Sequence, residues 1–418
     1  MYTTRFFRLL TPVLAVCLVC LFVLAVPLLH ASASGTHSST TSHAALPAIS
    51  TSCPAPGTAR AASLPSMTLG THPTIVYIVN EGSPTPTFGT LKRYDVVTGA
   101  KVEIVKMAGT SISEAQVSAN GQWLLFVANV SGQSKLQLIR MDGQFLQTLY
   151  CGAPSQAQWS TNQQLVVFSD TGSGHIYLLN VTNGVLQVEL SFSGGFTIHP
   201  RTWLDHTRAY VTLESTDSPP EKLAILDTSK GPNQQVQNLQ VAFDASTSTP
   251  FCWDFDSSFD TTKLFVSQCT ATSSGAPFPN ILGGPSVITV RPSIGGSYSY
   301  LYVNQGQAFT AVRAVTSNTL LFTVGNTSVN TSQNGLWKVG TNGSNPAHLA
   351  PSGEFNQFTQ FPWSNVSRDS SKYVLQIVQS TSTSTTYTLE YGSLSGGSPV
   401  VFASITNVQL ATVGWTTM

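Results

Sequence analysis

The sequence predicts an all-β protein that repeats a unit of four short strands. From Thr74 onward, short apolar runs alternate with Gly, Asn, Asp and Ser, and no long segment has the period of a helix. The stretch from Ser118 to Leu149 forms two hairpins in a row, one around an Asn-Gly turn and one around an Asp-Gly turn. Matching pairs of hairpins recur at intervals of roughly 40 to 60 residues, which is the length of one repeat unit.

The second hairpin of each unit carries a glycine where the chain reverses. "LQLIRMDGQFLQTL" around Gly143 is the clearest copy. Such a reversal commonly requires positive φ, which glycine adopts without steric cost. Matching segments surround Gly99, Gly184, Gly231, Gly295, Gly343 and Gly396.

The first hairpin also recurs, less regularly. "QVSANGQWLLFVA" is matched by "QWSTNQQLVVFSD", "TWLDHTRAYVTLE", "SSFDTTKLFVSQ", "RAVTSNTLLFTVG" and "NVSRDSSKYVLQIV". A seventh copy is split: "TIVYIVN" near residue 74 lacks an inner strand, and the C-terminal "NVQLATVGW" is an inner strand without partners.

This arrangement predicts a single β-propeller over residues 73–418. We expect seven four-stranded blades around a channel, with the C-terminal strand completing the first blade and closing the ring. Three tryptophans occupy equivalent inner-strand positions, and we expect them to pack between blades rather than to contact a ligand. They are Trp159, Trp203 and Trp415.

The repeat "VSANGQWLLFV...LQLIRMDGQFLQTL" resembles that of TolB-type and related Trp-Asp-repeat-like propellers. The resemblance covers nearly all of the repeat region. It departs from the family pattern at Asn120, where Asp is usual, and in lacking the proline of the turn. The resemblance implies an extracytoplasmic binding or assembly scaffold, and it implies no catalytic set of residues.

The N-terminus has the features of an export signal. Arg5 and Arg8 precede an apolar run from Pro12 to Leu29, and Ala31 and Ala33 frame a cleavage site. Residues 1–33 are therefore either a cleaved signal peptide, which we favour, or a membrane anchor. Residues 34–72, rich in Ser, Thr, Pro and Ala, are expected to form a flexible linker. Both alternatives place the propeller outside the cytoplasm, secreted or anchored.

Four cysteines follow the signal segment, and an even number in an exported chain favours disulfides. Cys252 and Cys269 flank two adjacent antiparallel strands, so we expect them to pair. Cys53 with Cys151 would then attach the N-terminal tail to the body. Free buried thiols are the alternative.

The charge content argues against nucleic-acid binding. Charged residues make up 9% of the chain, with 19 Lys and Arg against 19 Asp and Glu. The basic residues are scattered singly, whereas a phosphate-binding surface needs them clustered. We therefore expect no nucleic-acid partner, and membrane contact only through an uncleaved N-terminal segment.

Few residues suggest chemistry. The acidic cluster Asp254, Asp256 and Asp260 is a weak candidate for calcium, because alternation places the first two on one strand face. The chain has no nucleophile elbow, zinc-protease or dinucleotide motif, and we otherwise expect no cofactor. A lactonase-like or lyase-like enzyme is one alternative, and its only credible contributors are Glu81, Glu114, Asp170, His199, Arg201 and Arg313.

The sequence favours a binding protein over an enzyme, with a protein, peptide or glycan at the cell surface as its ligand. His199 and Arg201 are placed at the entrance to an inner strand, near the channel mouth. Long loops on the same face carry aromatic residues, and Arg313 is expected close to the channel. The aromatic candidates are Phe278, Phe309, Phe355, Phe358, Phe361 and Trp363. A structural part of an envelope complex is the third alternative.

Overall fold

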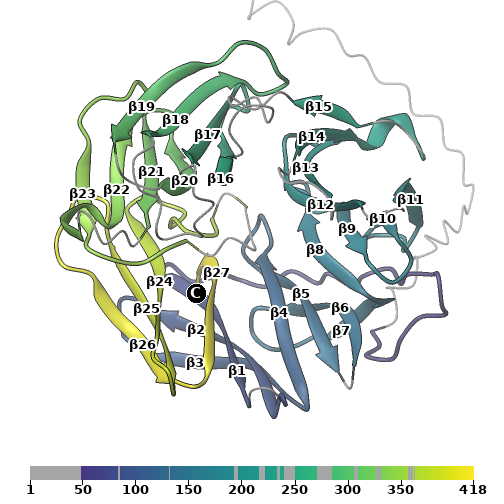
Figure 1. Cartoon of the computed structure of the whole chain (residues 1–418). Helices are drawn as coiled ribbons and strands as arrows, with labels where there is room; N and C mark the ends of the chain where they lie inside the picture. The colour runs from purple at the N-terminus through teal and green to yellow at the C-terminus, as the bar shows by residue number, and fades with distance from the viewer. Residues whose placement is uncertain are drawn as a thin grey trace, which may run out of the picture. The chain divides into compact units, whose positions relative to one another are not determined.

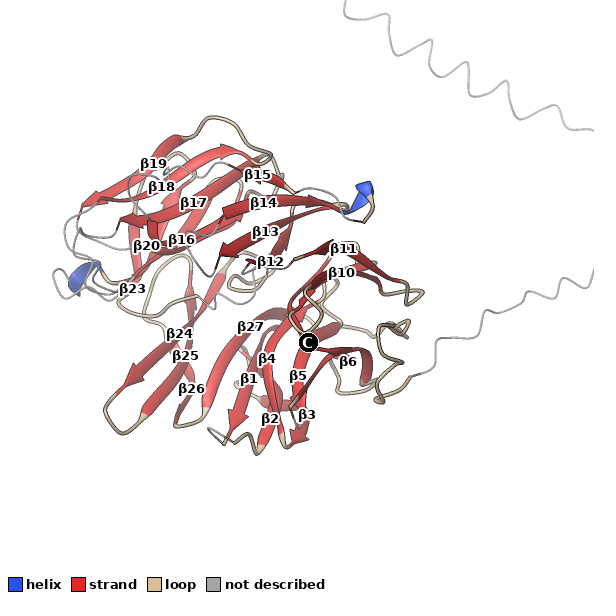
Figure 2. Cartoon of the chain, turned by 45° about the vertical axis from the view of Figure 1, so that its right-hand side comes forward, coloured by secondary structure: helices blue, strands red, loops and turns tan. Residues whose placement is uncertain are grey.

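The computed structural model describes residues 49–82, 85–130, 132–192, 196–215, 222–232, 236–239, 250–270, 285–305, 309–325, 331–355, 361 and 363–418. The expected export segment lies outside these residues. Almost all regular structure is strand (Figure 2), apart from the one-turn 3₁₀ helices η1 (Thr228–Lys230) and η2 (Thr331–Gln333). Within the described ranges, none of the helices has the length and apolar character needed to span a membrane.

The strands form separate antiparallel sheets, which we number as blades in chain order (Figure 1). Blade 1 contains β27 (Gln409–Thr417), β1 (Pro73–Glu81), β2 (Phe88–Asp95) and β3 (Lys101–Ala108). Blade 2 contains β4 (Thr110–Val117), β5 (Trp123–Val130), β6 (Gln133–Arg140) and β7 (Gln147–Gly152). Blade 3 contains β8 (Pro154–Trp159), β9 (Leu165–Asp170), β10 (His175–Asn180) and β11 (Leu186–Ser191).

The remaining blades continue around the ring. Blade 4 contains β12 (Phe196–Trp203), β13 (Arg208–Ser215), β14 (Lys222–Asp227) and β15 (Gln237–Leu239). Blade 5 contains β16 (Pro250–Ser257), β17 (Lys263–Thr270), β18 (Pro285–Pro292) and β19 (Ser299–Gln305). Blade 6 contains β20 (Phe309–Thr316), β21 (Thr319–Val324), β22 (Gly335–Gly340) and β23 (Ala347–Ala350), and blade 7 contains β24 (Lys372–Ser380), β25 (Thr385–Ser393) and β26 (Val400–Thr406).

The predicted seven-bladed propeller is confirmed, including its closure. The C-terminal strand β27 pairs with β1 from Pro73↔Thr417 to Asn80↔Gln409 and supplies the inner strand that blade 1 lacks in sequence. Blade 7 has three strands, and the described part of its inner segment makes only the isolated bridges Glu354↔Gln376 and Val366↔Tyr373. The repeat is therefore most degenerate at this position.

The core is divided among the spaces between blades. The described residues hold seven clusters of buried apolar side chains, and each cluster joins two neighbouring blades. Tyr210 of blade 4, for example, packs on Phe255 of blade 5 with ring centroids 5.4 Å apart. A single blade cannot bury both faces alone, so the closed ring is the stable unit.

The three equivalent tryptophans belong to these clusters, as predicted. Trp159, Trp203 and Trp415 are 3%, 8% and 0% exposed and lie between blades 2 and 3, 3 and 4, and 7 and 1 respectively. All three pack between blades, and Trp159 and Trp203 also contribute to the wall of a cavity described below.

The seven hairpin glycines also behave as predicted. Each lies in the turn before the outermost strand of its blade and has positive φ, from 74° at Gly99 and Gly184 to 107° at Gly295. At Gly343 the backbone passes so close to the carbonyl oxygen of Leu301 that a Cβ atom would lie 2.1 Å from it. Any side chain there would collide with backbone.

The first hairpin of the repeat is built around a Ser-x-Asn/Asp turn. In blade 2, Ser118 Oγ donates to Asn120 Oδ1 (2.7 Å) and accepts from the N–H of Trp123 (3.0 Å). Asn120 Oδ1 also accepts the N–H of Gln122 (3.0 Å). The same bonds occur in three other turns, which begin at Ser160, Ser258 and Ser367. Asn and Asp oxygens accept equally well here, which explains the departure from the family pattern at Asn120.

One turn offers a stability prediction. Gln163 has φ 60°, in the position that Gly121 occupies in blade 2, and side chains rarely adopt this conformation. Gln163→Gly is expected to raise the free energy of unfolding by about 0.5–1 kcal/mol, as read from the urea midpoint. Gln164→Gly, next to it at negative φ, should lower stability instead. A stabilising effect of both changes, or of neither, would contradict this account.

Residues 49–72, expected to be part of a flexible linker, lie against blades 2 and 3; we call this segment the strap. Strand β7 is the outer edge of blade 2, and the strap pairs with it: the N–H of Arg60 donates to the carbonyl of Leu149 (2.9 Å). The N–H of Ala62 donates to the carbonyl of Val181 in blade 3 (2.7 Å). An exposed strand edge presents unpaired backbone groups, and the strap satisfies them.

A disulfide holds the strap in place. Cys53 is bonded to Cys151 of β7, with Cα atoms 5.7 Å apart, which confirms this predicted pair. The register of blade 5 places Cys252 opposite Cys269, on β16 and β17. Their side chains lie outside the described part of the structure, so that disulfide stays a prediction.

Candidate functional site

The inner strands expose their edges to the channel, and side chains from neighbouring blades satisfy them. Glu114 of β4 accepts the N–H groups of Gln156 (2.7 Å) and Ala157 (3.0 Å) on β8. Gln116, two residues later, accepts the N–H of Trp159 (2.7 Å) and donates to its carbonyl (3.3 Å). The two-residue spacing places both side chains on the same face of β4, toward blade 3.

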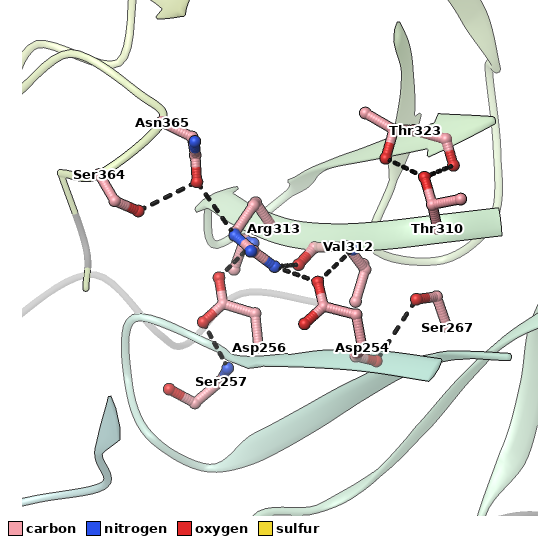
Figure 3. A network of polar contacts seen from close by, with 11 residues as sticks. Asp254, Asp256, Ser257, Ser267, Thr310, Val312, Arg313, Thr323, Ser364 and Asn365 are labelled. Atoms are coloured by element: carbon pink, nitrogen blue, oxygen red, sulfur yellow. Dashed lines mark hydrogen bonds and ion pairs between the residues drawn. The ribbon is translucent and has the colours of Figure 1, made fainter. Parts of the chain in front are cut away.

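Between blades 5 and 6, aspartate side chains bind the backbone of the neighbouring inner strand in the same way (Figure 3). Asp254 of β16 accepts the N–H of Val312 (3.2 Å), and Asp256 accepts the N–H of Ala314 (2.8 Å), both on β20. The guanidinium of Arg313 pairs with Asp254 and donates from Nε to Asn365 of blade 7 (3.1 Å). Because both charged side chains are about 95% buried, this network links three blades in a medium that strengthens charge pairing.

Two carboxyl groups of this layer, those of Glu114 and Asp256, have raised pKa values. Burial raises the pKa of Glu114 to about 7, although the two N–H donors favour its charged form. Burial also raises the pKa of Asp256 to about 6, against the attraction of Arg313. Both groups therefore change charge near neutral pH.

The raised pKa of Glu114 predicts that the free energy of unfolding decreases as the pH rises. The folded pKa of Glu114 is above the 4.5 of a free carboxyl, so the folded state binds the proton more tightly, and stability is lost as pH rises from about 4.5 through 7. Glu114→Gln should shrink the difference in unfolding free energy between pH 5 and pH 8 by about 1–2 kcal/mol, allowing for solvent screening.

The measurement is urea unfolding at both pH values. Glu103→Gln is the control, because Glu103 is exposed on β3. If Glu114→Gln left the pH dependence as it is in the native chain, the Glu114 carboxyl would not be the titrating group.

The acidic cluster is divided between two roles. Asp254 and Asp256 lie on one face, as expected, and both hold β20. Asp260 is exposed in the following turn and accepts from the hydroxyl of Ser258 (2.5 Å) and the N–H of Thr262 (3.1 Å); these bonds lower its pKa to about 2. Across the described residues, no group of three or more His, Cys, Asp or Glu is arranged to hold a metal ion.

A cavity of about 380 Å³ opens at one mouth of the channel. It lies on the face that carries the turns after the inner strands, and we call it the turn-face cavity. Blades 2 to 6 contribute the ends of β4, β8, β12, β16 and β20 with the turns that follow, and the segment before β24 contributes Phe361 and Trp363. The space is thus assembled from segments distant in the sequence.

The lining combines aromatic rings with amides and hydroxyls. Phe259, at the tip of the blade 5 turn, is 50% exposed. Gln116 and Gln158 occupy equivalent positions, two residues before the serine of the turn, and Asp256 takes that position in blade 5. A mostly apolar cavity with a few polar groups at its wall is the usual form of a small-ligand site.

The predicted ligand-binding residues are not gathered in this cavity. Of those described, only Phe361 and Trp363 line it, and the guanidinium of Arg368 is stacked 4.2 Å from the Trp363 ring. Phe309 and Arg313 are 0% and 4% exposed within blade interfaces. Phe355 is 3% exposed and borders a different cavity of about 390 Å³, whose walls include the end of β1 and the start of β4.

His199 and Arg201 lie in the middle of β12, each partly exposed, rather than at its entrance. Phe278 and Phe358 lie outside the described residues. Phe259, Gln116 and Gln158 line the turn-face cavity, and they were not among the candidates predicted from the sequence. The repeat itself could have found them, since they stand at fixed offsets from the turn serine.

The enzyme candidates are held apart by separate partners. Glu81 pairs with Lys106 at the end of blade 1 (3.7 Å). Asp170 accepts the hydroxyl of Tyr150 and the N–H of Gly172 (2.9 Å). Glu114 and Arg313 contact different blades, as described above.

No protein-family model matches the sequence, and no curated protein matches it significantly. Among solved structures, a prolyl endopeptidase matches with 12% identity and a TM-score of 0.52, over 84% of this chain and 50% of that chain. Prolyl oligopeptidase B from Galerina marginata matches with 9% identity and a TM-score of 0.50, over 80% and 49%. The chain therefore has the β-propeller fold. At this identity the likeness extends to the fold alone, and the chain spans about half the length of these two proteins.

TolB from Acinetobacter baumannii also matches, with 13% identity and a TM-score of 0.43, over 65% of this chain and 62% of that chain. The resemblance suggested by the repeat motif is to a propeller, and the seven blades observed agree with it. Function must be argued from the site, because propellers serve many activities.

Proposed function

We propose that this propeller is an extracytoplasmic binding protein that holds a glycan or peptide segment in the turn-face cavity. The observation that supports the proposal is the cavity itself, whose volume of about 380 Å³ falls in the range of small-ligand sites, roughly 300–1,000 Å³. Its aromatic rings offer faces for stacking. The exposed turn residues Thr161 and Thr261 carry hydroxyl groups at the cavity wall, and a hydroxyl can both donate and accept.

Location outside the cytoplasm is supported by two features. The N-terminus has the composition of an export signal, and the strap is fixed by the Cys53–Cys151 disulfide, a bond that persists in oxidising compartments. Cell fractionation with thiol labelling tests this part: the protein should be found outside the cytoplasm with both cysteines protected from alkylation.

Binding is tested with the purified protein on arrays of glycans and of short peptides. Phe259→Ala should weaken any specific binding at least tenfold and leave folding intact, because the ring is half exposed. Tyr300→Ala is the matched control, since Tyr300 is an equally exposed aromatic residue, 59%, on the outer strand β19 of the same blade. Binding that both variants lose or keep alike would place the ligand elsewhere, and an absence of binding on both arrays would reject the proposal.

A further inference from the structure

Arg291, on β18, is a buried cation that forms no ion pair with any residue that the structure describes. Its side chain is 3% exposed, and Nε, Nη1 and Nη2 all lack a hydrogen-bond partner within the described structure. Its burial lowers the pKa of the guanidinium. An arginine nevertheless stays protonated in proteins, so the site carries an uncompensated positive charge.

The surroundings make this charge unusual. The register pairs Arg291 with Leu264 on β17, whose side chain belongs to the apolar cluster between blades 4 and 5. Tyr210 acts on Arg291 electrostatically but donates its hydroxyl proton to the carbonyl of Ser293 (2.8 Å). A buried charge that no partner neutralises costs several kcal/mol, so natural chains rarely keep one without use.

A surface pocket has Arg291 in its wall. It lies between β15 of blade 4 and the turn that joins β18 to β19 in blade 5. Figure 1 shows β15 and β18 in adjacent blades. Gln237, Arg291, Gly296, Ser297 and Tyr298 contribute to its wall. The backbone of the turn passes close by, since a Cβ atom on Gly295 would lie 3.9 Å from Arg291 Nη2.

We propose that this pocket binds an oxyanion group, with the guanidinium of Arg291 as its principal contact. The planar fork of a guanidinium matches a carboxylate, phosphate or sulfate in two parallel hydrogen bonds. Ser297 and Tyr298 supply further hydroxyl donors at the pocket wall. The site lies on the rim between two blades and is separate from the turn-face cavity, because the two share no lining residue.

The test compares sodium phosphate, sulfate and acetate with sodium chloride at equal ionic strength, by thermal unfolding and by titration calorimetry. The native chain should show a saturable rise in melting temperature with at least one oxyanion, and calorimetric binding at one site per chain. Arg291→Met, similar in length and suited to an apolar interface, should fold and lose the binding at least tenfold. Arg291→Lys should retain part of it.

Arg208→Met is the matched control, because Arg208 is a surface arginine that pairs with Asp205 (2.6 Å). Sulfate and phosphate also stabilise folded proteins without a site, and this general effect should be equal in all four proteins. If native chain and Arg291→Met respond equally to every anion, the proposal is wrong. A preference for acetate over phosphate would point to a carboxylate ligand such as a peptide terminus, and the reverse to a phosphate or sulfate ester.

Discussion

Replacing Asp254 with alanine is expected to lower the free energy of unfolding by about 3–5 kcal/mol, which is the usual cost of breaking a buried ion pair. Asp254 is 3% exposed and pairs with Arg313, which is itself 4% exposed. Without the carboxylate, Arg313 would remain buried without its ion-pair partner, with only the attraction of Asp256 left, and the N–H of Val312 would lose an acceptor.

The double variant Asp254→Ala/Arg313→Met separates this cause from general loss of packing. Removing both charges should restore much of the stability, because the isolated charge is gone. Glu81→Ala is the control: it breaks a surface pair whose side chains are each 38% exposed, and should change stability by less than about 1 kcal/mol. Urea unfolding of the four proteins measures the effect. Equal losses in the single and double variants would show that the ion pair itself contributes little.

Trp415→Ala is expected to cost about 3–5 kcal/mol, the range for truncating a large buried side chain. Trp415 lies on the closing strand β27, is 0% exposed, and packs in the cluster that joins blade 7 to blade 1. The cavity left behind would lie at blade 1, which closes the ring by pairing the C-terminal strand β27 with β1.

Trp337→Ala provides the comparison, since it deletes the same atoms from a partly exposed position on β22 of blade 6. Its ring stacks on Phe322 and His348, away from the closure. Trp337→Ala should lower the free energy of unfolding by at least about 1 kcal/mol less than Trp415→Ala does. Thermal and urea unfolding measure both. A cost for Trp337→Ala equal to that of Trp415→Ala would show that closure adds nothing to ordinary packing.

Local patterns in the sequence carried most of the fold. Alternation marks the strands, and the turn glycines and Ser-x-Asn/Asp turns mark the reversals. The count of these hairpins, together with the unpartnered strand at each end, was enough to predict seven blades and their closure, because each signal depends on residues within a few positions of one another. The tryptophans at the ends of inner strands were placed correctly for the same reason.

Local sequence patterns did not predict which residues form the candidate site. Glu114 and Gln116 bind backbone groups of the next blade, and Asp254 meets Arg313 across 59 residues of sequence. The strap forms backbone hydrogen bonds with the edge of β7, although its composition predicted a flexible linker.

What the sequence by itself determined is therefore the repeat, the number of blades and the way the ring closes. The tertiary structure decided which side chains line the cavities, which polar side chains satisfy the edges of the inner strands and which described arginine forms no ion pair. These outcomes depend on side chains that meet only after the ring has closed, and a local pattern holds no information about such contacts.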